Sequence, residues 1–90
     1  MEYRAIRISP RDNVVIAVNT IPVDSIVEVP GYDEVRTNQE IPLGHKIAIL
    51  PIAKGEAVVR YGETICNSAQ NIERGDWVHT HNTVTKIRFE

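Results

Sequence analysis

The sequence contains a single cysteine, few aromatic residues and almost no net charge. The one cysteine, Cys66, excludes an internal disulfide and suits a reducing compartment, so we expect a cytoplasmic protein. A formal net charge of −2 and an aromatic content of 6% argue against a nucleic-acid partner, because nucleic-acid-binding barrels use basic and stacking side chains. No apolar run approaches the ~18 residues that cross a bilayer, and the first residues lack the apolar core of a signal peptide. We therefore expect no membrane partner.

The chain is short, with 90 residues, of which 42% are hydrophobic and 24% charged. This composition is ordinary for a soluble globular protein, and we interpret residues 1–90 as a single domain. A domain of this size buries roughly 60–65% of the surface that its unfolded chain exposes, which leaves little room for a deep active site. The size therefore suggests one part of a larger enzyme, and a homo-oligomer is left open.

Short apolar clusters rich in β-branched residues recur along the chain, separated by glycine, proline, asparagine and aspartate. The clusters are Ile6/Ile8, 14–18, 26–29, 46–50, 57–59 and 84–89. This spacing predicts an all-β fold, a small barrel or clip with at most short helical turns. No window keeps a helical period long enough to predict a helix. Residues 30–40 are the most polar stretch and are expected to form an exposed loop.

A short motif repeats within the chain. Ile-x-x-Gly, followed by a polar residue, any residue and then an aliphatic one, begins at Ile41, Ile52 and Ile72, and a degraded copy begins at Ile21 with Asp24 in place of glycine. Aspartate is one of the few residues besides glycine that tolerate a left-handed backbone. Each copy therefore predicts a core isoleucine, a tight turn with positive φ and a new strand.

Two of the three histidines, His79 and His81, lie in an uncharged segment that begins at Trp77. If this segment is a strand, both imidazoles point to one side, roughly 7 Å apart at their roots. They could then bracket an anionic ligand or share a metal. On the same assumption Thr80 faces the other way and packs, and Trp77 shares the histidine side and covers the core. Cys66 is expected to be a small buried hydrophobe.

Several longer motifs together resemble a known family. They are 12–15, Gly44-His45-Lys46, the stretch 52–65 with its Tyr61-Gly62-Glu63, and 71–82 with its Gly75-Asp76-Trp77-Val78-His79-Thr80-His81-Asn82. In these the chain resembles the N-terminal SAF-type domain of altronate/galactarate dehydratases, and it is similar to the small subunit of sulfolactate sulfo-lyase. The resemblance implies a small β-clip domain that works with a large catalytic subunit on a sugar acid or a sulfolactate-like substrate. It also implies a divalent metal, iron or similar, held mainly by that partner.

β-Elimination from a hydroxy acid needs a base, an acid and cationic groups that stabilise the enediolate. Histidines with near-neutral pKa values suit the first two roles, so His79 and His81 are the candidate catalytic residues. They are also the only plausible metal ligands here, although a pair is an incomplete site. The candidate substrate-binding residues are Asn82, His45, Lys46, Arg60 and Tyr61.

Structural roles for these residues stay open. Asn82 could equally end a strand in a turn, and Arg60 could simply be solvated. His45 and Lys46 are neighbours on an expected strand, so they should face opposite sides and serve one site only if the turn distorts them. The alternative to a lyase component is a non-catalytic SAF-type module that binds carbohydrate or protein. Exposed histidines on one concave face would favour the enzyme, and histidines buried against backbone would favour the module. The hydroxy acid and the leaving group, water or sulfite, are not determined.

Overall fold

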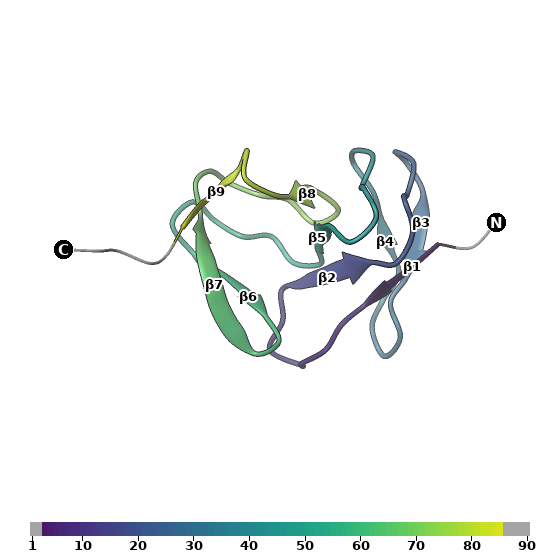
Figure 1. Cartoon of the computed structure of the whole chain (residues 1–90), viewed down its shortest axis with the longest axis horizontal. Helices are drawn as coiled ribbons and strands as arrows, with labels where there is room; N and C mark the ends of the chain where they lie inside the picture. Colours follow the sequence, from purple (N-terminus) through teal and green to yellow (C-terminus); the bar gives the residue numbers. More distant parts are fainter. Residues whose placement is uncertain (1–2, 86–90) are drawn as a thin grey trace.

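The computed structural model describes residues 3–85, and in that range the chain is all-β, as predicted. Its strands, shown in Figure 1, are β1 (Tyr3–Ile6), β2 (Val14–Ala17), β3 (Ile26–Glu28), β4 (Val35–Arg36), β5 (Lys46–Ala48), β6 (Ala57–Arg60), β7 (Glu63–Ser68), β8 (Trp77–Val78) and β9 (Thr83–Thr85). Since residues 3–85 include no helix, no helix there is long and apolar enough to cross a membrane. The last expected apolar cluster, 84–89, lies partly outside the described residues, and β9 contains its beginning.

The strands form two sheets, which occupy the two halves of the molecule in Figure 1. The larger sheet has six strands in the order β4-β3-β1-β2-β5-β8, and the smaller has three in the order β6-β7-β9. Only β1 and β3 pair in parallel among these strands. The short strands and the curled sheet are those of a small β-clip.

Side-chain alternation along β2 and β5 feeds two cores on opposite faces of the six-stranded sheet. One face carries Val15, Ala17 and Ile47 into a first core, together with Val27 and Val35 from neighbouring strands. The other face carries residues into a second core that the small sheet covers. The members of the second core are Val14, Ala48, Ile52, Val58, Ile72 and Val78, with Ile65 and Cys66 packed against them. β2 and β5 therefore belong to both cores and join the two halves.

All four copies of the repeated motif form the expected turn. Asp24, Gly44, Gly55 and Gly75 have φ values of 62°, 84°, 89° and 95°, and the isoleucine that opens each copy is buried. Each copy leads into a strand, β3, β5, β6 and β8 in turn. The repeat, including its degraded copy, is thus confirmed as a common structural device.

The four turns associate in two pairs. Ile21 pairs with Ile41, and Ile52 pairs with Ile72, each by two backbone hydrogen bonds of 2.8 Å. Within each pair, the N–H of the glycine or aspartate donates to a carbonyl four residues before the partner isoleucine. The donor–acceptor sets are Asp24 to Thr37, Gly44 to Ala17, Gly55 to Ser68 and Gly75 to Ala48. One hydrogen-bonding pattern therefore occurs four times.

One expectation about the fold is wrong. Residues 30–40 are not a simple exposed loop, because they contain β4, and Val35 and Thr37 are buried. The Thr37 hydroxyl donates to the Pro22 carbonyl at 2.8 Å. Farther along, the Gln39 side-chain oxygen accepts a hydrogen bond from the Trp77 N–H at 2.8 Å. Thr37 and Gln39 of this polar stretch therefore support two of the repeated turns by bonding to their backbone.

Candidate functional site

The histidine segment is a turn and not the strand that was considered from the sequence. β8 ends at Val78, and residues 79–82 reverse the chain, with the Asn82 N–H donating to the His79 carbonyl at 3.2 Å. Strand alternation therefore does not place His79 and His81. Thr80 is exposed at the turn and lines a small hollow beside His79, so the expectation that it packs is wrong.

The Asn82 side chain stabilises this turn through hydrogen bonds to its backbone. Its side chain is buried, with 3% of the residue exposed. The amide oxygen accepts the His79 N–H at 3.0 Å, and the amide nitrogen donates to the Trp77 carbonyl at 2.9 Å. Both ends of the amide are thus committed to backbone. The turn-forming role that was weighed for Asn82 from the sequence is the one that the geometry supports.

All three histidines gather around Trp77. The His79 ring stacks on the indole, with a centroid distance of 5.7 Å and an interplanar angle of 9°. His81 lies on the indole at 4.8 Å, and His45 lies 4.4 Å from His79 between ring centroids. Trp77 is half-buried and packs against the first core, so it both covers the core and forms the floor of this cluster. We call His45, Trp77, His79 and His81 the histidine cluster.

The hydrogen bond of His45 sets the state of its ring. The Trp77 indole N–H donates to His45 Nδ1 at 3.1 Å. Because Nδ1 accepts this bond, the tautomer that it favours has its proton on Nε2. His45 is thus a hydrogen-bond donor at its far nitrogen.

Lys46 lies on the other side of His79. Its side chain lines a hollow of about 150 Å³ together with Cys66, Val78 and His79. His45 and Lys46 therefore approach His79 from two sides, His45 from the Trp77 side and Lys46 from the hollow. The sequence left open that the turn could bring these neighbours to one site. It does so because His45 still belongs to the turn, while Lys46 is the first residue of β5. Cys66 is half-buried at the same hollow and packs on the second core.

The site is positively charged and partly shielded from water. Burial, followed by the Arg60 guanidinium, lowers the pKa of Lys46. Burial also lowers the pKa of His79, with smaller contributions from His45, Lys46 and His81. Within residues 3–85 neither Lys46 nor Arg60 forms an ion pair. A group of cations and imidazoles of this kind favours an anionic ligand.

Arg60 and Tyr61 stand at the β6–β7 hairpin. The Arg60 guanidinium carbon lies 4.8 Å from the centroid of the exposed Tyr61 ring. Tyr61 has φ of 57°, the left-handed conformation that glycine or asparagine usually takes. The Arg60 guanidinium is close enough to Lys46 to lower the pKa of that lysine. Tyr61 in turn contacts Arg60 through its ring.

Asp12 supports this hairpin and was not singled out from the sequence as a functional residue. It is buried, and its carboxylate accepts the Gly62 N–H at 2.8 Å and the Ser9 N–H at 3.0 Å. Burial raises the pKa of Asp12, but these backbone donors outweigh burial and hold the pKa below its usual value. Asp12 stays ionised and fixes the turn that carries Tyr61.

A second missed signal concerns His45. In the copies that begin at Ile52 and Ile72, the residue after the glycine is acidic, and its carboxylate accepts the N–H of the turn's second residue. These bonds are Ala53 to Glu56 at 2.8 Å and Glu73 to Asp76 at 2.9 Å. In the copy that begins at Ile41 the second residue is Pro42, which has no N–H. His45 occupies the position of the acid, but its turn has no N–H for the side chain to bond. This difference from the other copies is a signal in the sequence that His45 has another role.

A metal does not fit the residues that the structure describes. Residues 3–85 contain no group of three or more histidine, cysteine, aspartate or glutamate side chains that could hold a metal ion. His45 Nδ1, moreover, is occupied by the indole.

The fold is that of a small β-clip, and its site is a histidine cluster beside Lys46 and Arg60, which form no ion pair within residues 3–85. The chain belongs to the altronate/galactarate dehydratase SAF domain family, whose model matches residues 3–86. It is 33% identical over 82 residues to altronate dehydratase of Bacillus subtilis, covering 91% of this chain and 16% of that protein. It is 37% identical over 87 residues to altronate dehydratase of Escherichia coli, covering 97% and 17%. The chain thus spans about a sixth of the length of these relatives.

A shorter relative matches half of the chain. The (2R)-sulfolactate sulfo-lyase subunit alpha of Paracoccus pantotrophus is 43% identical over 47 residues, which is 52% of this chain and 70% of that protein. The family resemblance expected from the sequence is therefore confirmed by both kinds of relative.

Proposed function

We propose that this chain is the SAF component of a sugar-acid dehydratase or a related β-eliminating lyase. A larger catalytic part completes its site, either as a separate subunit or as the rest of the same polypeptide. The observation that carries the proposal is the convergence of three histidines on Trp77 beside Lys46. Relatives named dehydratases and a sulfo-lyase subunit support the reaction class.

In the proposed reaction the chain supplies proton transfer and anion binding. His79, whose lowered pKa favours the neutral ring near pH 7, accepts the proton α to the substrate carboxylate. The C–H electron pair forms the new double bond as the β carbon–oxygen bond breaks. The exposed His81 gives a proton to the departing oxygen, which leaves as water. Solvent then returns both histidines to their starting states.

Lys46, Arg60 and the Nε2–H of His45 would hold the substrate carboxylate and stabilise the enediolate. Tyr61 is a further substrate contact through its exposed ring, and Asn82 acts through the turn that it clamps. A divalent metal, iron or similar, would be held by the larger part, because the described residues of this chain do not fit one. The single free cysteine accords with a cytoplasmic enzyme.

The test is reconstitution. We expect the 90-residue chain alone to turn over neither altronate nor galactarate, and to restore dehydration when mixed with the larger part. His79→Ala combined with His81→Ala should lower kcat by about 100-fold or more without weakening association. Lys54→Ala, which changes an exposed lysine at another turn tip, is the matched control and should leave kcat unchanged. Full-rate turnover by the double variant would contradict the catalytic assignment.

A non-catalytic binding module is the second candidate, and one observation favours it. Asn82, which ends the histidine motif, is buried and bonded to backbone on both sides. Under that reading the histidine cluster is a structural cap on Trp77. Reconstituted activity that survives loss of both His79 and His81 would support the module.

A further inference from the structure

The second face of the six-stranded sheet is only half covered. Toward β8 it carries Val14, Ala48 and Val78, which the small sheet buries. Toward β1 the same face continues through Ile16, two residues from Val14 on β2, and Ile6, its cross-strand partner. No described residue packs over this second part to bury it, since Ile6 is 46% exposed and Val18, farther along, 36% exposed.

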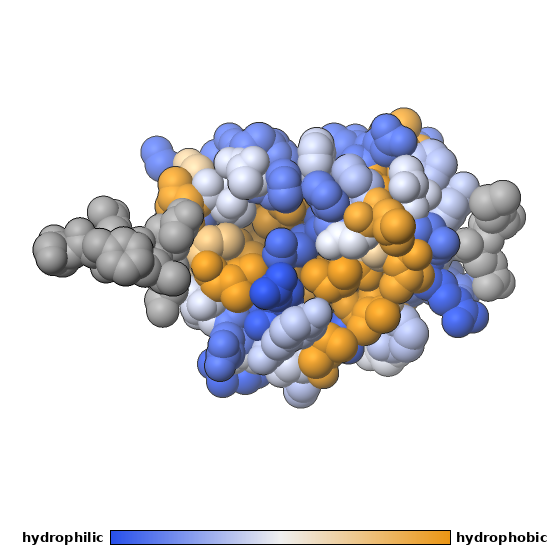
Figure 2. Space-filling model, viewed as in Figure 1, coloured by the Kyte–Doolittle hydropathy of each residue, from blue (hydrophilic) through white to orange (hydrophobic). Residues whose placement is uncertain are grey.

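These residues form an apolar patch of Ile6, Ile16, Val18 and Leu43. Val18 continues the alternation of Ile16, and its N–H donates to the Arg4 carbonyl at 3.2 Å. Leu43, 63% exposed, lies at the tip of the turn whose Gly44 N–H donates to the Ala17 carbonyl. Figure 2 shows apolar side chains gathered on one face over β1 and β2. Clustered exposed aliphatic residues of this kind mark an interaction surface.

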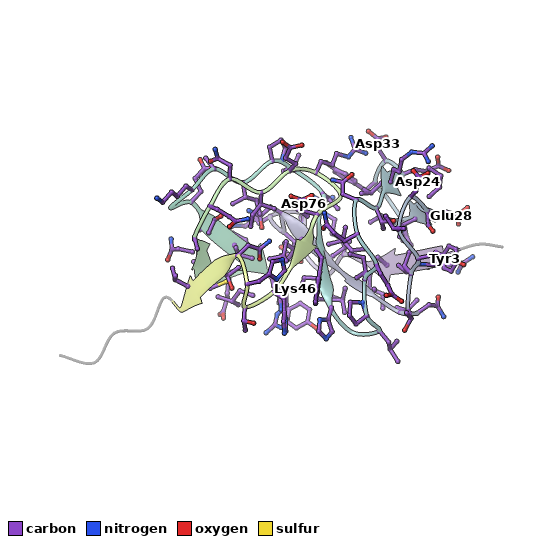
Figure 3. The ribbon with its side chains drawn as sticks, turned by 90° about the horizontal axis from the view of Figure 1, so that it is seen from above. Tyr3, Asp24, Glu28, Asp33, Lys46 and Asp76 are labelled. Carbon is purple, nitrogen blue, oxygen red and sulfur yellow. The ribbon has the colours of Figure 1, made fainter. Side chains whose placement is uncertain are left out.

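The apolar patch borders the candidate site directly. Ile16 is the cross-strand partner of Lys46, and cross-strand partners share a face. Leu43 is two residues before His45 in the same turn. Figure 3, seen from above, places Lys46 toward the face that Figure 2 presents. Of the labelled acidic residues, Asp24, Glu28 and Asp33 lie toward one end of the molecule and Asp76 lies nearer its middle. A body that closes over the hollow beside Lys46 therefore also covers the patch.

We propose that the apolar patch is the docking surface for the catalytic body of the lyase, the part that the relatives possess beyond this segment. This inference rests on the proposed function and adds the location of the interface. Two observations select the occupant: the hollow at Lys46 is small, about 150 Å³, and only partly enclosed, and the matched altronate dehydratases are about six times as long as the matching segment. The matching surface on the body is aliphatic.

The pseudo-repeat provides a matched pair of variants. Leu43 and Val23 are the third residues of paired copies, and both are exposed. Because Ile21 and Ile41 pair in antiparallel fashion, their turns run in opposite directions, and Val23 lies away from the patch. Leu43→Glu with Val18→Glu places charge on the proposed surface, and Val23→Glu places the same charge elsewhere at a similar site.

The experiment measures the affinity of the full 90-residue chain for the separately produced catalytic body by calorimetry, and turnover with the chain at saturation. We expect Leu43→Glu/Val18→Glu to raise Kd by about tenfold or more, to retain kcat at saturation, and to unfold in urea like wild type. We expect Val23→Glu to leave Kd unchanged.

If wild type binds and activates the body while the double variant binds equally well, the patch is not the interface and the proposed function stands. If Val23→Glu weakens binding as much as the double variant, the location is wrong. If wild type neither binds nor activates, the proposed function fails with it. If wild type instead self-associates on sedimentation, and Leu43→Glu/Val18→Glu abolishes this, the occupant is a second copy and the proposal is overturned.

Discussion

The two pairs of turns share one backbone pattern but differ in chemistry. In the pair of Ile52 and Ile72, the second residue keeps its N–H and the fifth is an acid that accepts it. In the pair of Ile21 and Ile41, proline stands second, and the fifth residues are Ser25 and His45. Without an N–H to satisfy, the fifth side chain is released from its own turn. Pro42 thus leaves the His45 side chain free to accept the hydrogen bond from Trp77. The repeated turns build the fold, and the site forms where one copy differs from the others.

The largest expected effect is a difference in unfolding free energy between alanine substitutions at Gly55 and Gly75, which hold equivalent positions in the turns that begin at Ile52 and Ile72. A Cβ on Gly75 would lie 2.2 Å from the Arg36 carbonyl oxygen, whereas a Cβ on Gly55 meets nothing within 4 Å. Gly55→Ala should cost about 1–2 kcal/mol of unfolding free energy from its positive φ alone. Gly75→Ala should cost about 3 kcal/mol or more, because backbone must also move. Urea denaturation measures both, and equal costs would show that Gly75 and the β4 segment do not touch.

The next effect compares the stability lost when either of two asparagine amides that bond to backbone, that of Asn82 or that of Asn13, is removed. Asn82→Ala removes the hydrogen bonds to the Trp77 carbonyl and the His79 N–H, and should cost about 2 kcal/mol. Asn13→Ala is its control, since the Asn13 amide likewise bonds the Ala57 carbonyl and the Val59 N–H. Both should lower stability, but only Asn82→Ala should shift the imidazole NMR signals of His79. Unshifted signals would contradict the assignment of Asn82 as the support of the histidine turn.

A smaller effect on stability tests whether the second and fifth residues of a turn depend on each other, as Ala53 and Glu56 do and Pro42 and His45 do not. Glu56→Ala should cost about 1 kcal/mol through loss of the cap on Ala53. His45→Glu should gain nothing, because Pro42 offers no N–H. When Pro42→Ala is added, a double-mutant cycle should show a favourable coupling of about 1 kcal/mol between the two positions. No coupling would mean that proline does not explain why His45 differs from its counterparts.

The sequence predicted the turns better than the site, for physical reasons. The Ile-x-x-Gly copies are local patterns, and even Asp24 was assigned correctly because aspartate tolerates positive φ. The approach of His45 to Trp77 depends on the pairing of β5 with β8, which joins residues 32 apart. The turn at His79 depends on Asn82 bonding backward, which competes with strand alternation and leaves no periodic signal. The roles of the site residues stay predictions.

The smallest effect is the pH response of the cluster. Burial and the neighbouring His45, Lys46 and His81 lower the pKa of His79 below the ordinary 6.5. Between that lowered value and 6.5, the unfolded chain binds more protons than the folded one, so folding stability falls as pH decreases through this window. NMR titration of His79 should give a midpoint below 6.5. Lys46→Met should raise it by removing one positive neighbour, while Lys54→Met, at the tip of a turn in the other pair, should not. A midpoint at or above 6.5 would mean that His79 is as hydrated as a free imidazole. The difference between the two pairs of turns would then be one of shape alone.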